Sequence, residues 1–438
     1  MGTRAWVTHP RVVACLGIGV AAVLGYLAAD VGKTHLSLGL AACAFPLVPL
    51  LLLRPMIGAA AGIAFLPFEM NVIGGSAFGL NIAPSDVLLS LAFAGVLLEA
   101  VRSHQLRTRF VALRPLIVPF GVYLVAALVV IAAHPSTRGV VRLVQRCEVV
   151  GIAAILGGCL LTERIARRAF LIFVVAGVVL TLLWLVHGGR PAIWAGQKNP
   201  SGQFIADAAL VTLALVRSRW RIPLALLLVA GVYATESRGA LIGLGAGVAV
   251  LILMSSRDPV QVIVRGLLVV IVFLGIFQVL PKAERDRLSG ETSSVRYSDH
   301  VRSIYARDAR RVIDEHPILG VGIGNYLEGD PAVLTLTDDP HDVVLLEAAE
   351  GGMVLLTGFI VLHLGAAFTV IRRRRRSTWA PLALAVEVAV ISHSVVDVYW
   401  VRGTPVAPWV LIGLALAAAH RAETTPAVPA GDPAGVIA

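Results

Sequence analysis

The sequence predicts an all-α polytopic membrane protein with about 12–14 transmembrane helices and one large extracytoplasmic loop that contains short amphipathic helices. Its 438 residues are 57% hydrophobic and 15% charged, and the mean hydropathy is +0.83. Soluble domains carry roughly 25% charged residues. The basic residues gather in short clusters beside apolar segments, as "RSHQLRTRF", "ERIARR", "RSRWR" and "RRRRR". This pattern is typical of a chain that crosses a membrane many times.

Apolar segments near the roughly 20-residue length of a bilayer crossing predict the individual spans. They lie near 12–29, 35–53, 56–68, 86–101, 115–133, 147–162, 169–187, 203–216, 221–235, 239–255, 260–280, 341–370, 378–397 and 403–420. The segments 56–68 and 203–216 are short, so tilted or re-entrant pieces are an alternative for both.

The basic clusters also predict an orientation. If Arg372–Arg376 is cytoplasmic, alternation of the spans puts the other strongly basic loops inside as well, except 134–146. That stretch, "HPSTRGVVRLVQR", would lie outside as a candidate anion site. The first span lacks a conspicuous small-residue cleavage site, so we expect an uncleaved anchor.

Charge and cysteine usage exclude other classes. The net charge of +10 belongs largely to short loops and requires no nucleic acid to explain it. The cysteines lie in or beside apolar spans without metal-type spacing, so neither a disulfide framework nor a zinc site is expected; they are Cys15, Cys43, Cys147 and Cys159.

The chain divides into five predicted parts. They are N-terminal transmembrane helices (1–187), core transmembrane helices with an arginine motif (188–280), the extracytoplasmic loop (281–340), C-terminal transmembrane helices (341–420) and a disordered cytoplasmic tail rich in Pro, Ala and Gly (421–438).

Within the loop, "VRSIYARDARRVIDE" has the spacing of an amphipathic helix on a membrane surface, with Ile304, Ala309 and Val312 on its buried side. The following "HPILGVGIGNY" contains Gly320, Gly322 and Gly324. Such glycines suit either a simple turn or a cradle for phosphate.

His341 is the first candidate for chemistry. Pro340 fits the first position of a helix and Asp339 its N-cap, which places His341 in the first turn of the next span. Leu345, Ala348 and Gly352 would then share its face. An interfacial polar residue without a catalytic role is the alternative interpretation.

Further candidates lie at the same predicted face of the membrane. Arg238, in "YATESRGALIGLGAG", stands where one span ends and the next begins, and a cation at that depth generally has a partner. It could instead reach lipid headgroups or pair with Glu236. Lys198 and Asn199 precede another span, as binding residues or as an ordinary loop end.

The order of these motifs resembles the O-antigen ligase and O-antigen polymerase superfamily. The resemblance rests on "QKNPSGQFIADAAL", "ESRGALIGLG", "HPILGVGIGNY" and "HDVVLLEAAEGGMVLLTGF", over roughly 190–360. Members move glycans from polyprenyl diphosphate onto an acceptor. Two residues depart from the usual pattern, because Asp342 stands where Asn is usual and Leu355 where Gly is common.

The resemblance implies roles for particular residues. The essential arginine of the SRG-like motif corresponds to Arg238 and the essential histidine to His341. The arginine of the loop helix corresponds to Arg302, 14 residues before His316, with Arg296 as the rival. Lys198 and Asn199 are further substrate-binding candidates.

These residue types suit glycan transfer. A neutral imidazole can accept the proton of a sugar hydroxyl, and arginines can bind a diphosphate bidentately. We therefore expect metal-independent transfer without a cofactor, with His341 as general base, in the bacterial cytoplasmic (inner) membrane. The expected partners are a polyprenyl-diphosphate-linked glycan donor, a glycan, lipid or protein acceptor, and membrane lipids, but no nucleic acid.

Two other functions stay open at this stage. A proton-coupled secondary transporter would use intramembrane carriers, for which the candidates are Asp207, Glu347, Glu350, Glu387 and His393. The sequence shows no internal repeat of the kind that many transporters have. A non-catalytic membrane scaffold would leave the 281–340 loop without a role.

Overall fold

A computed structural model describes residues 47–66, 73–75, 80–82, 84–103, 110–187, 198–255, 258, 260–261, 263–267, 293–326, 339–397, 400 and 405–424. The predicted span at 12–29, most of those at 35–53 and 260–280, and residues 425–438 of the predicted tail lie outside the described residues.

The described chain is built almost entirely from helices, which confirms the predicted fold class. The helices are α3 (Leu47–Leu53), α4 (Pro55–Phe65), α5 (Pro84–Ser103), η1 (Val111–Leu113), α7 (Arg114–Ala133), α8 (Thr137–Cys147), η2 (Glu148–Ile152), α9 (Ala153–Ile155), η3 (Leu156–Leu160), α10 (Glu163–His187), α11 (Lys198–Leu215), α12 (Arg221–Ala234), α13 (Arg238–Ser255), α16 (Ser293–Glu315), α17 (Val343–Arg373), α18 (Ala380–Ser394) and α19 (Val406–Thr424). A small antiparallel ribbon, β1 (Ile73–Gly75) and β2 (Leu80–Ile82), pairs Gly74 with Asn81.

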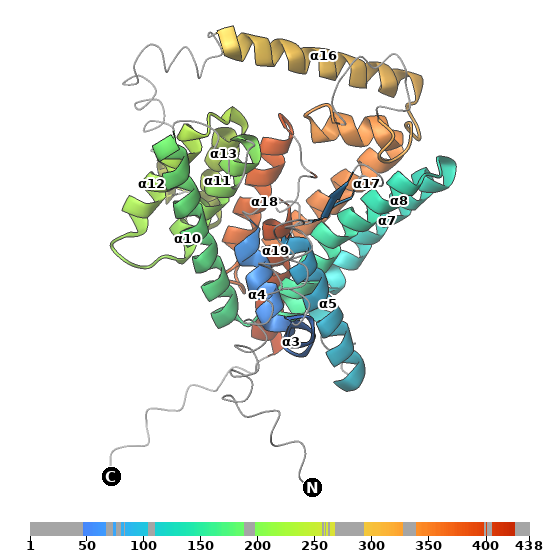
Figure 1. Cartoon of the computed structure of the whole chain (residues 1–438). Helices are drawn as coiled ribbons and strands as arrows, with labels where there is room; N and C mark the ends of the chain where they lie inside the picture. The colour runs from blue at the N-terminus through green and yellow to red at the C-terminus, as the bar shows by residue number, and fades with distance from the viewer. Residues whose placement is uncertain are drawn as a thin grey trace, which may run out of the picture.

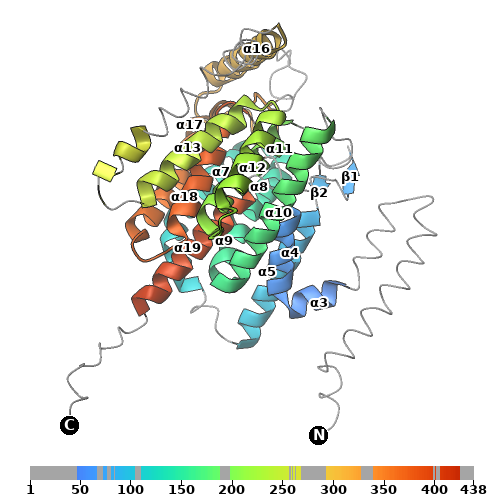
Figure 2. The same ribbon diagram turned by 90° about the vertical axis from the view of Figure 1, so that its left-hand side faces the viewer.

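The helices form a bundle with α16 lying across one end of it, as both views show (Figures 1 and 2). The inner helices are α11, α18 and α19, whose side chains are buried on almost every face. Helices α7 and α10 lie further out and expose large apolar side chains, among them Val118 and Val175. A helix that is apolar all round needs apolar surroundings. The outer surface of the bundle is therefore suited to lipid.

Within the described residues, four helical stretches are long and apolar enough to cross a membrane: Val111–Ala133, Thr137–Leu160, Glu163–Val186 and Val343–Arg373. Shorter apolar helices accompany them at Pro55–Phe65, Arg221–Ala234, Arg238–Met254 and Ala380–Ser394. The polytopic membrane architecture agrees with the sequence, while the total number of spans stays a prediction.

The basic stretch 134–146 is not a loop, which corrects the sequence interpretation. Ser136 caps α8 by accepting a hydrogen bond from the Gly139 N–H at 3.0 Å. From Thr137 the chain is helical through α8, η2, α9 and η3 to Leu160. The arginines follow helical spacing, at Arg138, Arg142 and Arg146, so this amphipathic segment continues directly into an apolar one.

Close packing of α13 against α18 depends on a stripe of glycines. A Cβ atom on Gly243 would lie 2.5 Å from the Ala389 carbonyl oxygen, and one on Gly247 would lie 2.9 Å from that of Ala385. A Cβ atom on Gly239 would meet the ring of His393 at 2.4 Å. Small residues at every fourth position let two membrane helices approach backbone to backbone. The glycine of the SRG motif therefore belongs to the helix contact.

Helix α17 breaks at Gly352, so the predicted span 341–370 is not one continuous helix. Gly352 has φ 58° and ψ −158°, a conformation that is essentially restricted to glycine. The segment 317–322 lies against the break. The Val321 and Gly322 N–H groups donate to the carbonyls of Ala349 (3.0 Å) and Glu350 (2.8 Å).

The backbone N–H groups of α17 that follow the break are also paired with this segment. The Met353 N–H donates to the Pro317 carbonyl at 2.9 Å, and the Val354 N–H donates to that of Ile318 at 3.3 Å. Backbone groups freed by a helix break in a membrane protein must find partners inside the protein. The segment 317–322 supplies them, and it packs so closely that a Cβ atom on Gly352 would lie 2.2 Å from the Ile318 carbonyl.

We expect Gly243→Ala to destabilise the protein by about 1–3 kcal/mol, because the added methyl group must displace the α18 backbone. The matched control is Gly245→Ala on the same helix, where a Cβ atom meets nothing within 4 Å. Alanine has the higher helix propensity, so any propensity effect favours both variants equally. Thermal unfolding in detergent measures the difference, and equal stability of the two variants would contradict the role assigned to the stripe.

Candidate active site

His341 lies in a turn that precedes α17, and the predicted position in the first helical turn is wrong. The N-cap is Asp342, whose side chain accepts hydrogen bonds from the N–H groups of Val344 (2.8 Å) and Leu345 (3.1 Å). Asp339, the predicted cap, instead accepts the backbone N–H of His341 at 2.6 Å. Two aspartates compete for the cap in this stretch, and the one that directly precedes Val343 takes it.

The turn holds His341 in a left-handed backbone conformation with φ 55°. Such a conformation is uncommon for residues other than glycine and is seen most often for Asn, Asp and His. The predicted helical face shared with Leu345, Ala348 and Gly352 therefore does not form. The imidazole projects from a turn, about one-third exposed, where another molecule can approach it.

Among the described residues, the imidazole contacts Asp397 and Tyr305. Its Nδ1 atom lies 3.0 Å from Oδ1 of Asp397, a buried carboxylate that follows α18. Its ring stacks on Tyr305 of α16, with 5.7 Å between centroids and an interplanar angle of 21°. A carboxylate on one ring nitrogen fixes the tautomer and leaves the other nitrogen, Nε2, to accept a proton.

The surroundings strengthen His341 as a base. The hydrogen bond to Asp397 raises the pKa of His341 above its ordinary value; burial opposes this effect, the charges of Asp397 and Asp339 add to it, and the charge of Arg302 opposes it. Burial alone would raise the pKa of Asp397, but the interactions with His341 and His393 bring it below its usual range. Burial raises the pKa of Asp339 to about 7.

One face of α16 connects His341 to the arginine of the SRG motif. Asp299, Arg302 and Tyr305 follow each other at three-residue spacing, so they lie on adjacent turns of one side. Asp299 pairs with Arg238, and Tyr305 stacks on His341. These two contacts are six residues apart along the helix, about 9 Å at 1.5 Å per residue. Arg302 lies between them.

Arg296 does not share this arrangement. It lies six residues before Arg302, about 9 Å further along the helix, its side chain is exposed, and it is Arg302 whose charge acts on His341. Of the two loop arginines that the sequence put forward, the fold brings Arg302 to the histidine.

Arg238 is the first residue of α13, at the predicted junction of two helices. Helix α12 ends at Ala234, Glu236 takes a left-handed conformation with φ 59°, and Ser237 caps α13 by accepting the Ala240 N–H at 3.3 Å. Arg238 pairs with Asp299 of α16, a partner that the sequence did not suggest.

Helix α11 begins beside the same junction. Lys198 and Asn199 occupy its first two positions and are half-buried. Three residues later, Gly202 lies so near the junction that a Cβ atom there would meet Thr235 and Ser237 at 2.8 and 2.9 Å. The fold therefore brings the start of α11 and the start of α13 together.

The glycine-rich segment 320–324 acts as a packing turn. Besides the backbone contacts with α17, the Gly324 N–H donates to Oε1 of Glu350 at 2.8 Å. The N–H groups of Val321, Gly322 and Gly324 are thus used within the protein. Of the two interpretations that the sequence allowed, the turn holds and the phosphate cradle does not.

A buried ionic cluster that the sequence analysis missed lies beneath this turn. Arg146 of α8 is 2.6 Å from Glu350 and 3.2 Å from Glu347. The Trp400 indole donates to Glu347 at 2.6 Å and lies 4.9 Å from the Arg146 guanidinium. Arg146 also donates to the Tyr123 hydroxyl at 3.2 Å. The only signal in the sequence was the i, i+3 spacing of the two glutamates.

The other carriers of the transporter interpretation also have partners. Asp207 accepts from Gln203 at 2.7 Å, and Glu387 lies 2.5 Å from Nδ1 of His363. His393 contacts Gln203 and Asp397. None of these contacts by itself favours transport over a role in holding the helices together.

Asp397 is the second functional candidate that the sequence analysis missed. Its i, i+4 spacing from His393, at the end of an apolar span, could have indicated a polar pair. That it also reaches His341, 56 residues earlier in the chain, follows only from the fold. No group of three or more His, Cys, Asp or Glu side chains suited to a metal ion occurs in the described part of the chain. The metal-independent mechanism stays a prediction.

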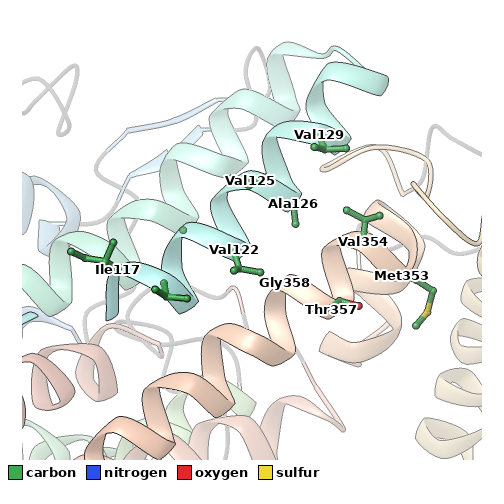
Figure 3. Close-up of a pocket in the computed structure, with 11 residues that line it drawn as sticks. Ile117, Val122, Val125, Ala126, Val129, Met353, Val354, Thr357 and Gly358 are labelled. Carbon is green, nitrogen blue, oxygen red and sulfur yellow. The ribbon is translucent and has the colours of Figure 1, made fainter. Parts of the chain in front are cut away.

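An apolar groove runs between α7 and α17 (Figure 3). It extends along α7 from Ile117 to Val129 and along α17 from Met353 to Gly358, and Thr357 is its one polar side chain. Its volume of about 690 Å³ is that of a ligand-sized site. Because Met353 directly follows the break at Gly352, one end of the groove begins at the break. Its lining suits hydrocarbon.

Comparison with known proteins agrees with this arrangement of motifs. Residues 223–360 match the family model described as O-Antigen ligase. The match begins in α12 and includes Arg238, α16, the glycine-rich turn and the first part of α17. No curated protein matches the sequence significantly. The chain is a membrane protein that carries, over residues 223–360, a domain of the O-antigen ligase superfamily.

Proposed function

We propose that this protein transfers a glycan from a polyprenyl diphosphate carrier to an acceptor hydroxyl at the outer face of the bacterial cytoplasmic membrane. One observation carries the proposal: a histidine paired with a buried carboxylate lies beside Arg302 and about 9 Å along α16 from the Arg238 contact. Glycan transfer in general agrees with the family match. The donor, the acceptor and the residue roles are our proposals.

His341 acts as the general base. With its Nδ1–H donated to Asp397, its Nε2 takes the proton of the acceptor hydroxyl, and the acceptor oxygen attacks the anomeric carbon of the donor sugar. The bond between this carbon and the diphosphate oxygen breaks, and the polyprenyl diphosphate leaves with the electron pair. Asp397 orients the ring and stabilises the imidazolium that forms, as a carboxylate does behind a catalytic histidine.

The arginines bind the diphosphate. Arg302 lies next to His341, and Arg238 is held near it by Asp299, an exposed carboxylate that a diphosphate can replace. A guanidinium stays charged at any physiological pH and offers two parallel N–H groups to phosphate oxygens. Lys198 and Asn199, beside the same junction, are proposed as further donor contacts, and Arg296 as an outer one.

Deletion of the gene tests the reaction class. The envelope glycans of the deletion strain should lack glycosylated acceptor and accumulate polyprenyl-linked intermediates, measured by mass spectrometry. Loss of single repeat units would indicate polymerisation, and loss of whole chains would indicate ligation to a lipid or protein. Unchanged glycans and carrier pools would contradict the proposal.

The topology predicts that α16 lies outside the cytoplasm. In a chain whose four cysteines are replaced by serine, Ser293→Cys should react with a membrane-impermeant thiol reagent in intact cells. Thr378→Cys, exposed just after the arginine run, is the matched control and should react only after lysis. The reverse pattern would invert the proposed orientation.

The donor contacts predict that charge alone is insufficient. Arg238→Lys and Arg302→Lys should impair transfer nearly as much as the alanine variants, because lysine lacks the planar pair of N–H groups. Arg307→Lys, on an exposed part of α16, is the control and should transfer normally. Full activity of both variants in a purified assay would show that the bidentate role is wrong.

The proposed role of His341 as general base predicts how the transfer rate depends on pH. His341→Ala should lower transfer by about 10²–10⁴-fold, the usual contribution of a positioned base. In the wild type, activity should fall as the pH drops through the raised pKa of His341, because the protonated ring has no lone pair to accept a proton. Asp397→Asn should lower the pKa of His341, so the acid limb should move to lower pH while the rate also falls.

Initial rates across pH, measured on purified protein with a lipid-linked donor, check this expectation. Transfer by His341→Ala within a few-fold of wild type would remove His341 from the mechanism. If the acid limb of the pH–rate profile stays at the same pH in Asp397→Asn, Asp397 does not set the pKa of His341.

A further inference from the structure

A chain of buried polar side chains continues from Asp397 into the bundle. Nε2 of His393 lies 3.3 Å from Oδ2 of Asp397, and Nδ1 of His393 lies 2.8 Å from Oε1 of Gln203. The Gln203 amide nitrogen lies 2.7 Å from Oδ1 of Asp207. All four side chains are at most 5% exposed. With His341 on the other carboxylate oxygen, the chain joins α11, α18 and the turn before α17.

We propose that His393, Gln203 and Asp207 are positioning residues, which hold a second N–H group on Asp397 and thereby limit how strongly Asp397 acts on His341. The expected effect on the titration of His341 does not depend on the transfer reaction proposed above. The expected effect on activity rests on that proposed function.

The hydrogen-bond partners imply that Nε2 of His393 carries a proton, whichever way the Gln203 amide is turned. If the Gln203 oxygen faces His393, then Nδ1 donates to it and the Gln203 amide donates to an ionised Asp207; Nε2, which faces a carboxylate, must also carry a proton. If the amide is turned by half a rotation, it donates to Nδ1 and accepts from a protonated Asp207, and the single ring proton lies on Nε2. Both arrangements carry the same total charge.

Both arrangements therefore leave an N–H group of His393 that faces Oδ2 of Asp397 at 3.3 Å. A carboxylate that faces two N–H groups, one at each oxygen, has its negative charge stabilised by both and attracts the proton of each less strongly. The 3.0 Å contact with His341 is a hydrogen bond, and the 3.3 Å contact with His393 is at ion-pair distance. Asp397 is thus shared unequally, with His341 as the stronger partner.

The positions of the chain members are set by the helix packing. Gln203 and Asp207 are four residues apart on α11 and share a face, and Asp397 follows the end of α18, four residues after His393. Gly239 gives the His393 ring its room, because a Cβ atom there would lie 2.9 Å from Nε2. The SRG motif thus contributes Arg238 to the proposed donor site, and its Gly239 leaves room for His393, which contacts Asp397.

Other titratable groups also lie near these histidines in the described part of the chain. His341 also faces Asp339, Arg302 and Tyr305. Deeper in the bundle, Glu387 lies near Asp207 and pairs with His363. Because Asp397 contacts both histidines, we expect substitution of His393 to act on His341 through Asp397.

The test measures the titration of His341 without using activity. The rate at which diethyl pyrocarbonate modifies His341 is followed against pH by peptide mass spectrometry on the full-length protein in detergent. In His393→Phe, which keeps a ring but has no N–H group, the titration should move to higher pH by on the order of 0.5–1 unit, because Asp397 acts on His341 alone.

Two controls separate this effect from a general loss of structure. His393→Gln offers an amide N–H to Asp397 and should restore the titration of the wild type. Ser394→Ala, the buried neighbour that bonds only its own helix at Val390, should not shift it. A folded His393→Phe that titrates like wild type, or Phe and Gln variants that shift alike, would overturn the proposal.

A second measurement does not require His393→Phe to fold. In protein labelled with ¹⁵N-histidine, with His393 assigned by the signal lost in His393→Gln, Nε2 should be protonated throughout the pH range of the folded state. An unprotonated Nε2 would overturn the proposal even if His393→Phe does not fold. If the titration of His341 moves in His393→Phe but the pH profile of transfer does not, the positioning chain stands and the assignment of His341 as base fails.

Discussion

The break in α17 at Gly352 is the constraint on which the rest of the site depends. A helix that is interrupted near a membrane must have its freed N–H and C=O groups paired inside the protein, since lipid offers no partners. Residues 317–322 pair with both sides of the break, and the Glu350 side chain pairs with Gly324. This arrangement orients the short first part of α17, and with it the turn that carries His341.

The buried charges around Arg146 explain how the break is held. A guanidinium away from water is tolerated only when carboxylates and hydrogen-bond acceptors surround it. Glu347 and Glu350 meet this need from α17, and Trp400 and Tyr123 enclose the group. Helix α8, which the sequence suggested as an outer anion-binding loop, instead contributes its last arginine to this cluster. Loss of one partner in such a cluster is costly, so the cluster favours a single geometry for the turn.

Helix α16 combines two tasks on two faces. Ala309 and Val312 are fully buried and pack with Val321, Leu346 and Ala349, so the expected apolar side of the helix meets protein. Its other contacts, through Asp299 and Tyr305, reach Arg238 and His341. Because α16 is anchored at both places, Arg302 between them is held near His341. The same helix is therefore both the cover of the site and one of its walls.

The sequence by itself determined the membrane class, most of the described helices, the amphipathic α16 and the residue types that the proposed transfer uses, because apolar length, helical spacing and side-chain chemistry are local properties. It also selected His341, Arg238 and Arg302, through motifs that stand in a recognisable order. The helix start at Asp342 was misjudged because two neighbouring aspartates offer similar caps, and their choice depends on what each carboxylate meets. Only the tertiary structure decided the break at Gly352, the pairing of Arg146 with two glutamates, and the union of His341 with Asp397. Each of these joins residues distant along the chain, and helix packing, which no local pattern encodes, brings them within hydrogen-bond reach.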